Sequence, residues 1–84
     1  MMVIVEVSVK TSPSDEYYFG EEWSITPLKE STGVYAITRT FDNRREVFYL
    51  DVTTMEIEHF TTISGKIVAR TVESVMELTM KRSE

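Results

Sequence analysis

Few residues in this chain of 84 could carry out catalysis or bind a metal ion. His59 is the only histidine, and the sequence contains no cysteine. His59 follows Glu56 and Glu58, and these three side chains would suit a metal ion if they shared one face of their element. In a strand, however, the two carboxylates point to one side and the imidazole to the other. We therefore expect His59 to be structural, with neither a metal site nor a cofactor.

The spacing of the remaining polar residues does not indicate an enzyme. A serine nucleophile would need His59 as its base, and no nucleophile elbow or oxyanion-type glycine sequence accompanies any serine. Gly20, Gly33 and Gly65 are isolated, so no glycine-rich loop could cradle a phosphate. A chain of this length would also lose much of its core to a catalytic cavity. The sequence predicts no catalytic residues.

Arg39, Arg44 and Arg45 are the best candidates for contacts with nucleic acid, as a basic tip on a hairpin. The formal net charge of −5, however, repels phosphate at a distance. Three arginines would also release only about three counterions on binding. We therefore do not expect nucleic acid to be the partner.

The stretch from Ser14 to Trp23 mixes acidic and aromatic residues more densely than any other. We read Thr11 to Glu21 as a loop, because it has no steady periodicity. In one interpretation Phe19, Trp23 and one tyrosine fold under the sheet as core. In the other, rings anchor a protein partner and carboxylates complement its basic surface. The candidate partner-binding residues are Asp15, Glu16, Tyr17, Tyr18, Glu21 and Glu22.

Most of the chain before residue 60 alternates as strands do. The predicted strands are Met2–Lys10, Trp23–Thr26, Val34–Phe41, Glu46–Val52 and Met55–Glu58. The residues Asp42–Arg45 supply the turn of a central hairpin, and Asp51–Thr54 supplies a second tight connection. The sequence therefore predicts an antiparallel meander of about five strands.

The stretch from Ser64 to Arg82 predicts an amphipathic helix, with Ser64 as its N-cap. At about 100° per residue, its apolar side chains fall within an arc of about 220°. These residues are Ile67, Val68, Ala69, Val72, Val75, Met76, Leu78 and Met80. The expected fold is α+β, with this C-terminal helix packed on one face of the sheet, in a single small domain over residues 1–84.

The strand Glu46–Val52 is apolar on both sides, which has a consequence for assembly. We expect Phe48, Leu50 and Val52 to face the helix, joined by Ile57 and by four valines of the first strand, Val3, Val5, Val7 and Val9. Val47 and Tyr49 then point the other way, where no second helix is predicted to cover them. Val47 and Tyr49 are therefore a candidate homodimer face.

In length and charge, the chain is similar to small acidic proteins of phages and mobile elements, including anti-restriction and anti-CRISPR inhibitors. This resemblance implies an inhibitor or modulator that occupies a basic surface of a larger protein. We expect a non-enzymatic protein-binding module; the alternative is a structural subunit that forms a homo-oligomer through its sheet. Because Glu6 and Ser8 interrupt the apolar run VIVEVSV, we expect a soluble cytoplasmic protein without a membrane partner.

Overall fold

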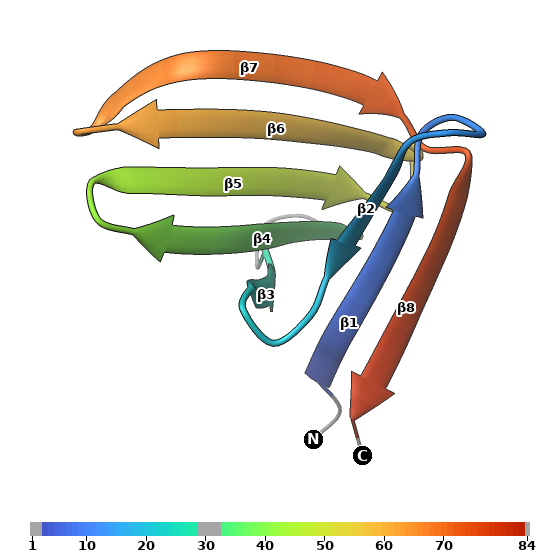
Figure 1. Cartoon of the computed structure of the whole chain (residues 1–84). Coiled ribbons are helices and arrows are strands. Elements are labelled where there is room, and N and C mark those ends of the chain that lie inside the picture. The colour runs from blue at the N-terminus through green and yellow to red at the C-terminus, as the bar shows by residue number, and fades with distance from the viewer. Residues whose placement is uncertain (1–2, 29–32, 84) are drawn as a thin grey trace.

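The computed structural model describes residues 3–28 and 33–83, and these residues form strands and no helix. The strands are β1 (Val3–Lys10), β2 (Glu16–Phe19), β3 (Ser24–Pro27), β4 (Val34–Phe41), β5 (Arg44–Asp51), β6 (Glu56–Ile63), β7 (Lys66–Ser74) and β8 (Glu77–Ser83). They form two antiparallel sheets (Figure 1). The small sheet has three strands in the order β2-β1-β8, and the large sheet has five in the order β3-β4-β5-β6-β7.

The predicted helix from Ser64 to Arg82 is wrong, and with it the α+β class. This stretch forms β7 and β8, which belong to different sheets. Ser64 and Gly65 have φ angles of 51° and 81°. Two consecutive positive φ values suit the type I′ turn of a hairpin, so these residues connect β6 to β7 instead of capping a helix. The fold is all-β, and no helix that could span a membrane occurs within residues 3–28 and 33–83.

The chain crosses from the large sheet to the small sheet at Val75 and Met76. The Val75 side chain is buried, with 8% of its surface exposed. Its backbone N–H donates to the carbonyl of Met55 at 2.8 Å, and the next N–H, of Met76, donates to the carbonyl of Lys10 at 2.7 Å. These two hydrogen bonds fix the crossing to the β5–β6 connection on one side and to the end of β1 on the other.

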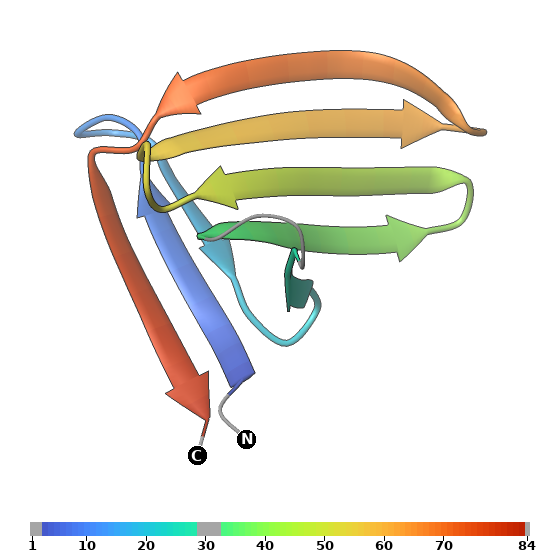
Figure 2. The same cartoon turned by 180° about the vertical axis from the view of Figure 1, so that it is seen from behind.

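The core lies between the small sheet and one face of the large sheet, which we call the inner face (Figures 1 and 2). Its buried apolar residues are Val7, Val9, Phe19, Ile37, Phe48, Leu50, Ile57 and Val75. Phe48 is central, because its ring lies 4.8 Å from that of Phe19 and 5.6 Å from that of Trp23, measured between centroids. Phe48, Leu50 and Ile57 are therefore core residues as expected, but they face the small sheet and not a helix.

The first strand does not keep its valines on one face. Val7 and Val9 are fully buried, whereas Val3 and Val5 are 46% and 38% exposed. The pairing of β1 with β8 shifts register between Ile4 and Glu6, which makes Val5 a bulge. Ile4 then packs against the core in place of its neighbours.

The central hairpins agree with the sequence. β4 and β5 are joined at Asp42–Asn43, and the β5–β6 connection is held by Asp51, whose Oδ1 accepts hydrogen bonds from the N–H groups of Thr53 (2.9 Å) and Thr54 (3.1 Å). β6 is longer than predicted and ends at Ile63. The predicted Thr11–Glu21 loop is also wrong in part, because it contains β2.

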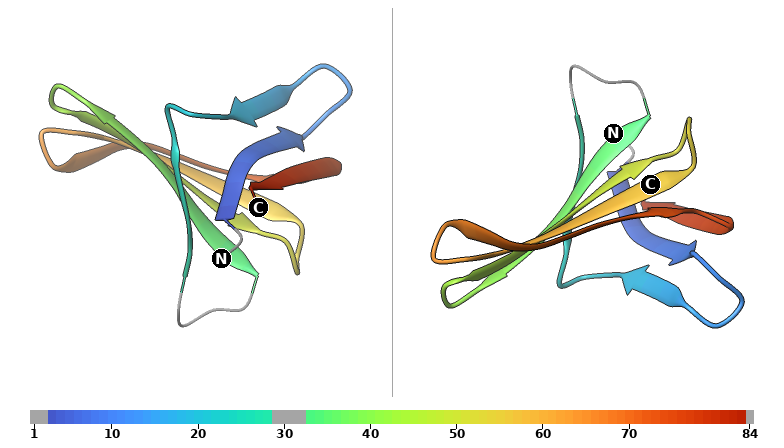
Figure 3. Two further views of the ribbon diagram at one scale, coloured as in Figure 1. Left: turned by 90° about the horizontal axis from the view of Figure 1, so that it is seen from below. Right: turned by 90° about the horizontal axis from the view of Figure 1, so that it is seen from above.

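The large sheet extends beyond the small sheet at the end that carries the Asp42–Asn43 and Ser64–Gly65 turns (Figure 3). The two turns contact each other: the Ser64 N–H donates to the Asn43 carbonyl at 2.9 Å, and Asn43 Nδ2 donates to Ser64 Oγ at 3.1 Å. We call this the projecting end. The opposite end, which holds Leu50 and Ile57 under the small sheet, is the covered end.

Candidate protein-binding surfaces

Tyr17 and Tyr18 are neighbours in β2 and therefore point to opposite faces of the small sheet. The Tyr17 ring faces the core, with its centroid 5.2 Å from that of Phe48, and its hydroxyl donates to Oε1 of Glu73 at 2.9 Å. Burial, reinforced by Glu73, raises the pKa of Tyr17. Tyr18 is 59% exposed. Of the two predicted anchors, only Tyr18 is on the surface.

Tyr18 is oriented by Glu6 of the adjacent strand β1. The Tyr18 hydroxyl donates a hydrogen bond to Glu6 Oε1, and Lys81 Nζ of β8 lies 3.3 Å from Glu6 Oε2. The hydrogen bond from Tyr18, and then Lys81, lower the pKa of Glu6, while the same bond raises the pKa of Tyr18. At neutral pH, Glu6 is therefore a carboxylate and Tyr18 its hydrogen-bond donor.

Of the four predicted carboxylates, Asp15 and Glu22 contact other side chains, and Glu16 and Glu21 are exposed. Asp15 accepts a hydrogen bond from the Ser12 hydroxyl at 2.9 Å, within the β1–β2 turn. Glu22 lies 3.3 Å from the guanidinium of Arg39. Glu21 is exposed and lines a depression of about 380 Å³ together with Val5, Glu6 and Tyr18. Glu16 is exposed on the face that carries Tyr18.

We define the Tyr18 surface as Glu6, Glu16, Tyr18 and Glu21. It contains an exposed aromatic ring and three carboxylates, of which Glu6 is paired with Lys81. Glu6 was not among the predicted site residues. The pairing of β1 with β2 places Ser8 opposite Tyr18 and Glu6 one step along the same face, and this was missed because β2 was read as loop.

Arg39 does not belong to a basic tip. Its guanidinium lies 4.5 Å from the Trp23 ring centroid and 2.8 Å from Glu46, and Glu46 raises the pKa of Arg39. His59 Nε2 lies 3.6 Å from the same Glu46, and its ring stacks on Phe48 at 3.9 Å between centroids. These contacts bind Arg39, Glu46 and His59 to the edge of the core, which is a structural role.

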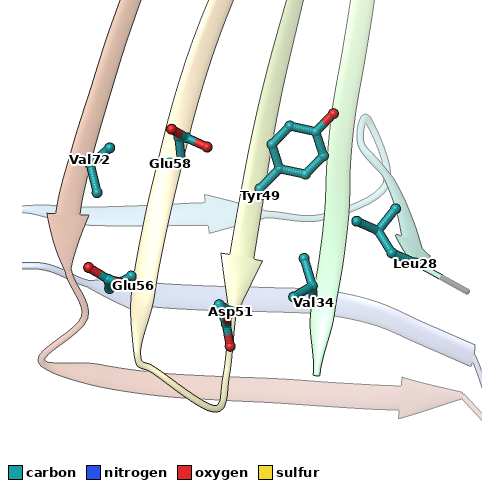
Figure 4. A pocket seen from close by; sticks show the side chains of 7 residues that line it. All are labelled: Leu28, Val34, Tyr49, Asp51, Glu56, Glu58 and Val72. Atoms are coloured by element: carbon teal, nitrogen blue, oxygen red, sulfur yellow. The ribbon is translucent and has the colours of Figure 1, made fainter. Parts of the chain in front are cut away.

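Val47 and Tyr49 lie on the outer face of the large sheet, opposite the face that packs on the small sheet, as expected from alternation. Val72 of β7 and Phe60 of β6 lie beside them, and the Phe60 and Tyr49 ring centroids are 5.9 Å apart. Tyr49 and Val72 are 37% and 55% exposed. Tyr49 and Val72 also line a shallow depression of about 360 Å³ at the covered end (Figure 4).

Sequence reasoning missed Phe60 because the predicted strand stopped at Glu58. Extending the alternation Glu56, Glu58 by one step would have placed Phe60 on the outer face. Val72 was recognised as apolar, but it was assigned to the buried side of a helix. In the structure, Val72 is exposed on the outer face of the large sheet.

Within the described part of the chain, no group of three or more His, Cys, Asp or Glu residues could hold a metal ion. His59 points to the inner face, whereas Glu56 and Glu58 point outward, as strand alternation requires. Comparisons of the chain with protein-family models, curated proteins and solved structures found no match.

Proposed function

We propose that this protein is a non-catalytic protein-binding module that docks on a basic surface of a larger protein through the Tyr18 surface. The observation that carries the proposal is the Tyr18 ring, which is exposed and oriented by Glu6. Aromatic rings that keep few rotamers lose little entropy on binding and are common anchors in interfaces. Glu16 and Glu21 flank this ring with negative charge.

The charge of the whole chain supports a basic partner. A formal net charge of −5 on 84 residues attracts cationic surfaces over about 8 to 10 Å at physiological ionic strength. Carboxylates at the rim act mainly on the association rate, and a buried ring acts mainly on the dissociation rate. A small acidic protein bound in this way blocks the partner's basic surface. It thereby inhibits the binding of the partner's usual ligand, nucleic acid included.

The test is capture of binding proteins by immobilised protein from an extract of the native host, followed by binding kinetics with the protein captured. Tyr18→Ala is expected to raise the off-rate roughly tenfold or more, because the anchor is lost. Glu21→Lys is expected to slow the on-rate and to flatten its dependence on salt. Each variant is first shown to be folded by circular dichroism.

Two matched controls separate the Tyr18 surface from general effects. Phe41→Ala removes another exposed aromatic ring, and Glu56→Lys makes the same charge change on the outer face of the large sheet, away from the Tyr18 surface. Both are expected to bind almost as the wild type does. If a captured protein binds Tyr18→Ala and Glu21→Lys with wild-type kinetics, the Tyr18 surface is not the binding site.

A second candidate function, a structural subunit that assembles through its sheet, is favoured by a different observation. The outer face of the large sheet carries apolar side chains that no other described residue covers.

A further inference from the structure

The outer face of the large sheet has an apolar centre. Val47, Tyr49, Phe60 and Val72 meet there from the three adjacent strands β5, β6 and β7. The small sheet packs on the opposite face, so in the described part of the chain this centre is open to solvent. Such a patch on a strongly paired sheet is typical of an interaction surface.

The charges around this centre are unequally distributed along the strands. The register of β5 and β6 places Asp51 opposite Glu56 and Tyr49 opposite Glu58. Three carboxylates therefore lie at the covered end of the outer face (Figure 4). Arg45, on the same face of β5 as Asp51, lies at the projecting end next to the Asp42–Asn43 turn. The outer face is therefore acidic at the covered end, whereas its projecting end carries Arg45, with Asp42 of the turn lining the same depression.

Arg70 lies between these two ends and is already neutralised. Its Nη2 atom lies 2.7 Å from Glu58 Oε2, and its guanidinium carbon lies 5.5 Å from the Phe60 ring centroid. Arg45, Asp51 and Glu56 have no ion pair with another residue of the described ranges. The charges that remain for a partner are thus at the two ends.

We infer that the outer face is the interface of a symmetric homodimer, in which two copies stack face to face with their β5 strands antiparallel. In a two-fold dimer each surface contacts its own copy, so the face must complement itself. The antiparallel arrangement puts Arg45 of each copy against the Asp51 and Glu56 end of the other. A parallel arrangement would put carboxylates against carboxylates and arginine against arginine.

The available area suits a dimer of modest affinity. Strands β4 to β7, of eight or nine residues each, and the four-residue β3 lie about 4.8 Å apart and together cover on the order of 600 Å² at about 3.3 Å per residue. Two such faces bury on the order of 1,200 Å² together, which is the lower limit for a specific interface. The two outer faces would pack about 10 Å apart, as in a β-sandwich.

The first measurement is sedimentation equilibrium over a range of concentrations up to the high micromolar. The wild type is expected to shift from monomer to dimer. Tyr49→Glu is expected to remain a folded monomer, because the new charge lies on the outer face, where it opposes dimerisation without entering the core. Tyr18→Ala, on the small sheet, is the control and is expected to dimerise as the wild type does. A wild-type protein that stays monomeric, or a Tyr49→Glu protein that dimerises equally well, overturns the inference.

The orientation is tested by charge reversal at the two ends. Arg45→Glu and Glu56→Arg are each expected to weaken self-association at least tenfold, since each places like charges together in both halves of the dimer. An equimolar mixture of the two variants restores opposite charges and is expected to form a heterodimer with near wild-type affinity. If the mixture associates no better than the separate variants, the antiparallel arrangement is wrong.

Discussion

Ile57 and Ile63 lie on the same face of the same strand, yet their surroundings differ completely. Ile57, at the covered end of β6, is 2% exposed beneath the small sheet, whereas Ile63, at the projecting end, is 39% exposed. Burial therefore stabilises only one end of the large sheet. The projecting end depends on ladder hydrogen bonds, on its turns and on the contact between Asn43 and Ser64.

The same isoleucine substitution at the two ends gives the largest expected difference. Ile57→Ala should lower the free energy of unfolding by about 2 to 5 kcal/mol, because it leaves a cavity in the core. Ile63→Ala should lower it by less than about 1 kcal/mol, because that side chain is already in solvent. Chemical denaturation of both variants at low protein concentration measures the difference. Equal losses would show that the projecting end is also packed.

Glycine substitutions compare the turns at the two ends. Gly33 and Gly65 have φ angles of 88° and 81°, which alanine adopts only with strain. A Cβ atom on Gly33, at the covered end, would lie 2.6 Å from Thr53 Oγ1, whereas one on Gly65 would meet nothing within 4 Å. Gly33→Ala should therefore cost about 2 kcal/mol and Gly65→Ala about 1 kcal/mol. A larger loss at Gly65 in thermal unfolding would contradict this order.

Tyr17 links the small sheet to the covered end through its hydrogen bond to Glu73. Tyr17→Phe should lower the free energy of unfolding by about 1 kcal/mol at neutral pH. Because the pKa of Tyr17 is raised in the folded state, its contribution is fully present below the ordinary tyrosine pKa of about 10 and is lost as the pH rises through the folded value.

Denaturation of wild type and Tyr17→Phe across this alkaline range provides the check. The difference between the two proteins should shrink above about pH 10. A difference that stays constant there would mean that the Tyr17 hydroxyl does not titrate differently in the folded state.

The sequence was sufficient where turn chemistry and alternation agreed. Asp42–Asn43 and Asp51 are turn residues between clearly alternating strands, and the β4–β5–β6 meander follows from them. Phe48 and Leu50 on one face, with Val47 and Tyr49 on the other, follow from the same alternation. The placement of Val47 and Tyr49 opposite the core face was therefore predicted correctly from the sequence, whereas the homodimer remains a prediction.

The sequence failed where neighbouring strands belong to different sheets. β7 is an edge strand exposed on nearly its whole length, so its apolar residues keep no period of two. The β6–β7 register also shifts between Thr61 and Thr62, and the chain changes sheets at Val75. Because of these irregularities, the apolar residues fall on one side when they are plotted at the helical angle of about 100° per residue. This helical pattern was therefore preferred, although Ser64–Gly65 is typical of a hairpin turn and β-branched residues lie around it.

The acidic-aromatic stretch was ambiguous for a related reason. Phe19 and Trp23 pack in or against the core, as the first interpretation predicts, while Tyr18 is exposed, and its role as an anchor for a partner stays a prediction. Which tyrosine is buried depends on the register of β2 against β1, which pairs Val7 with Phe19. Register is set by the hydrophobic patterns of the two strands and by the turn between them, and neither was applied here because β2 was read as loop.

The central claim is that residues 64–83 form β7 and β8, which belong to different sheets. Both proposed surfaces depend on it, because Lys81 of β8 pairs with Glu6 of the Tyr18 surface and Val72 of β7 lies on the outer face. The most direct measurement is a nuclear Overhauser spectrum of the labelled protein. Cross-strand contacts are expected between Val7 and Met80 and between Thr61 and Ala69. Contacts from each residue to the third one along, running from Ser64 to Arg82, would instead show a helix and contradict the fold.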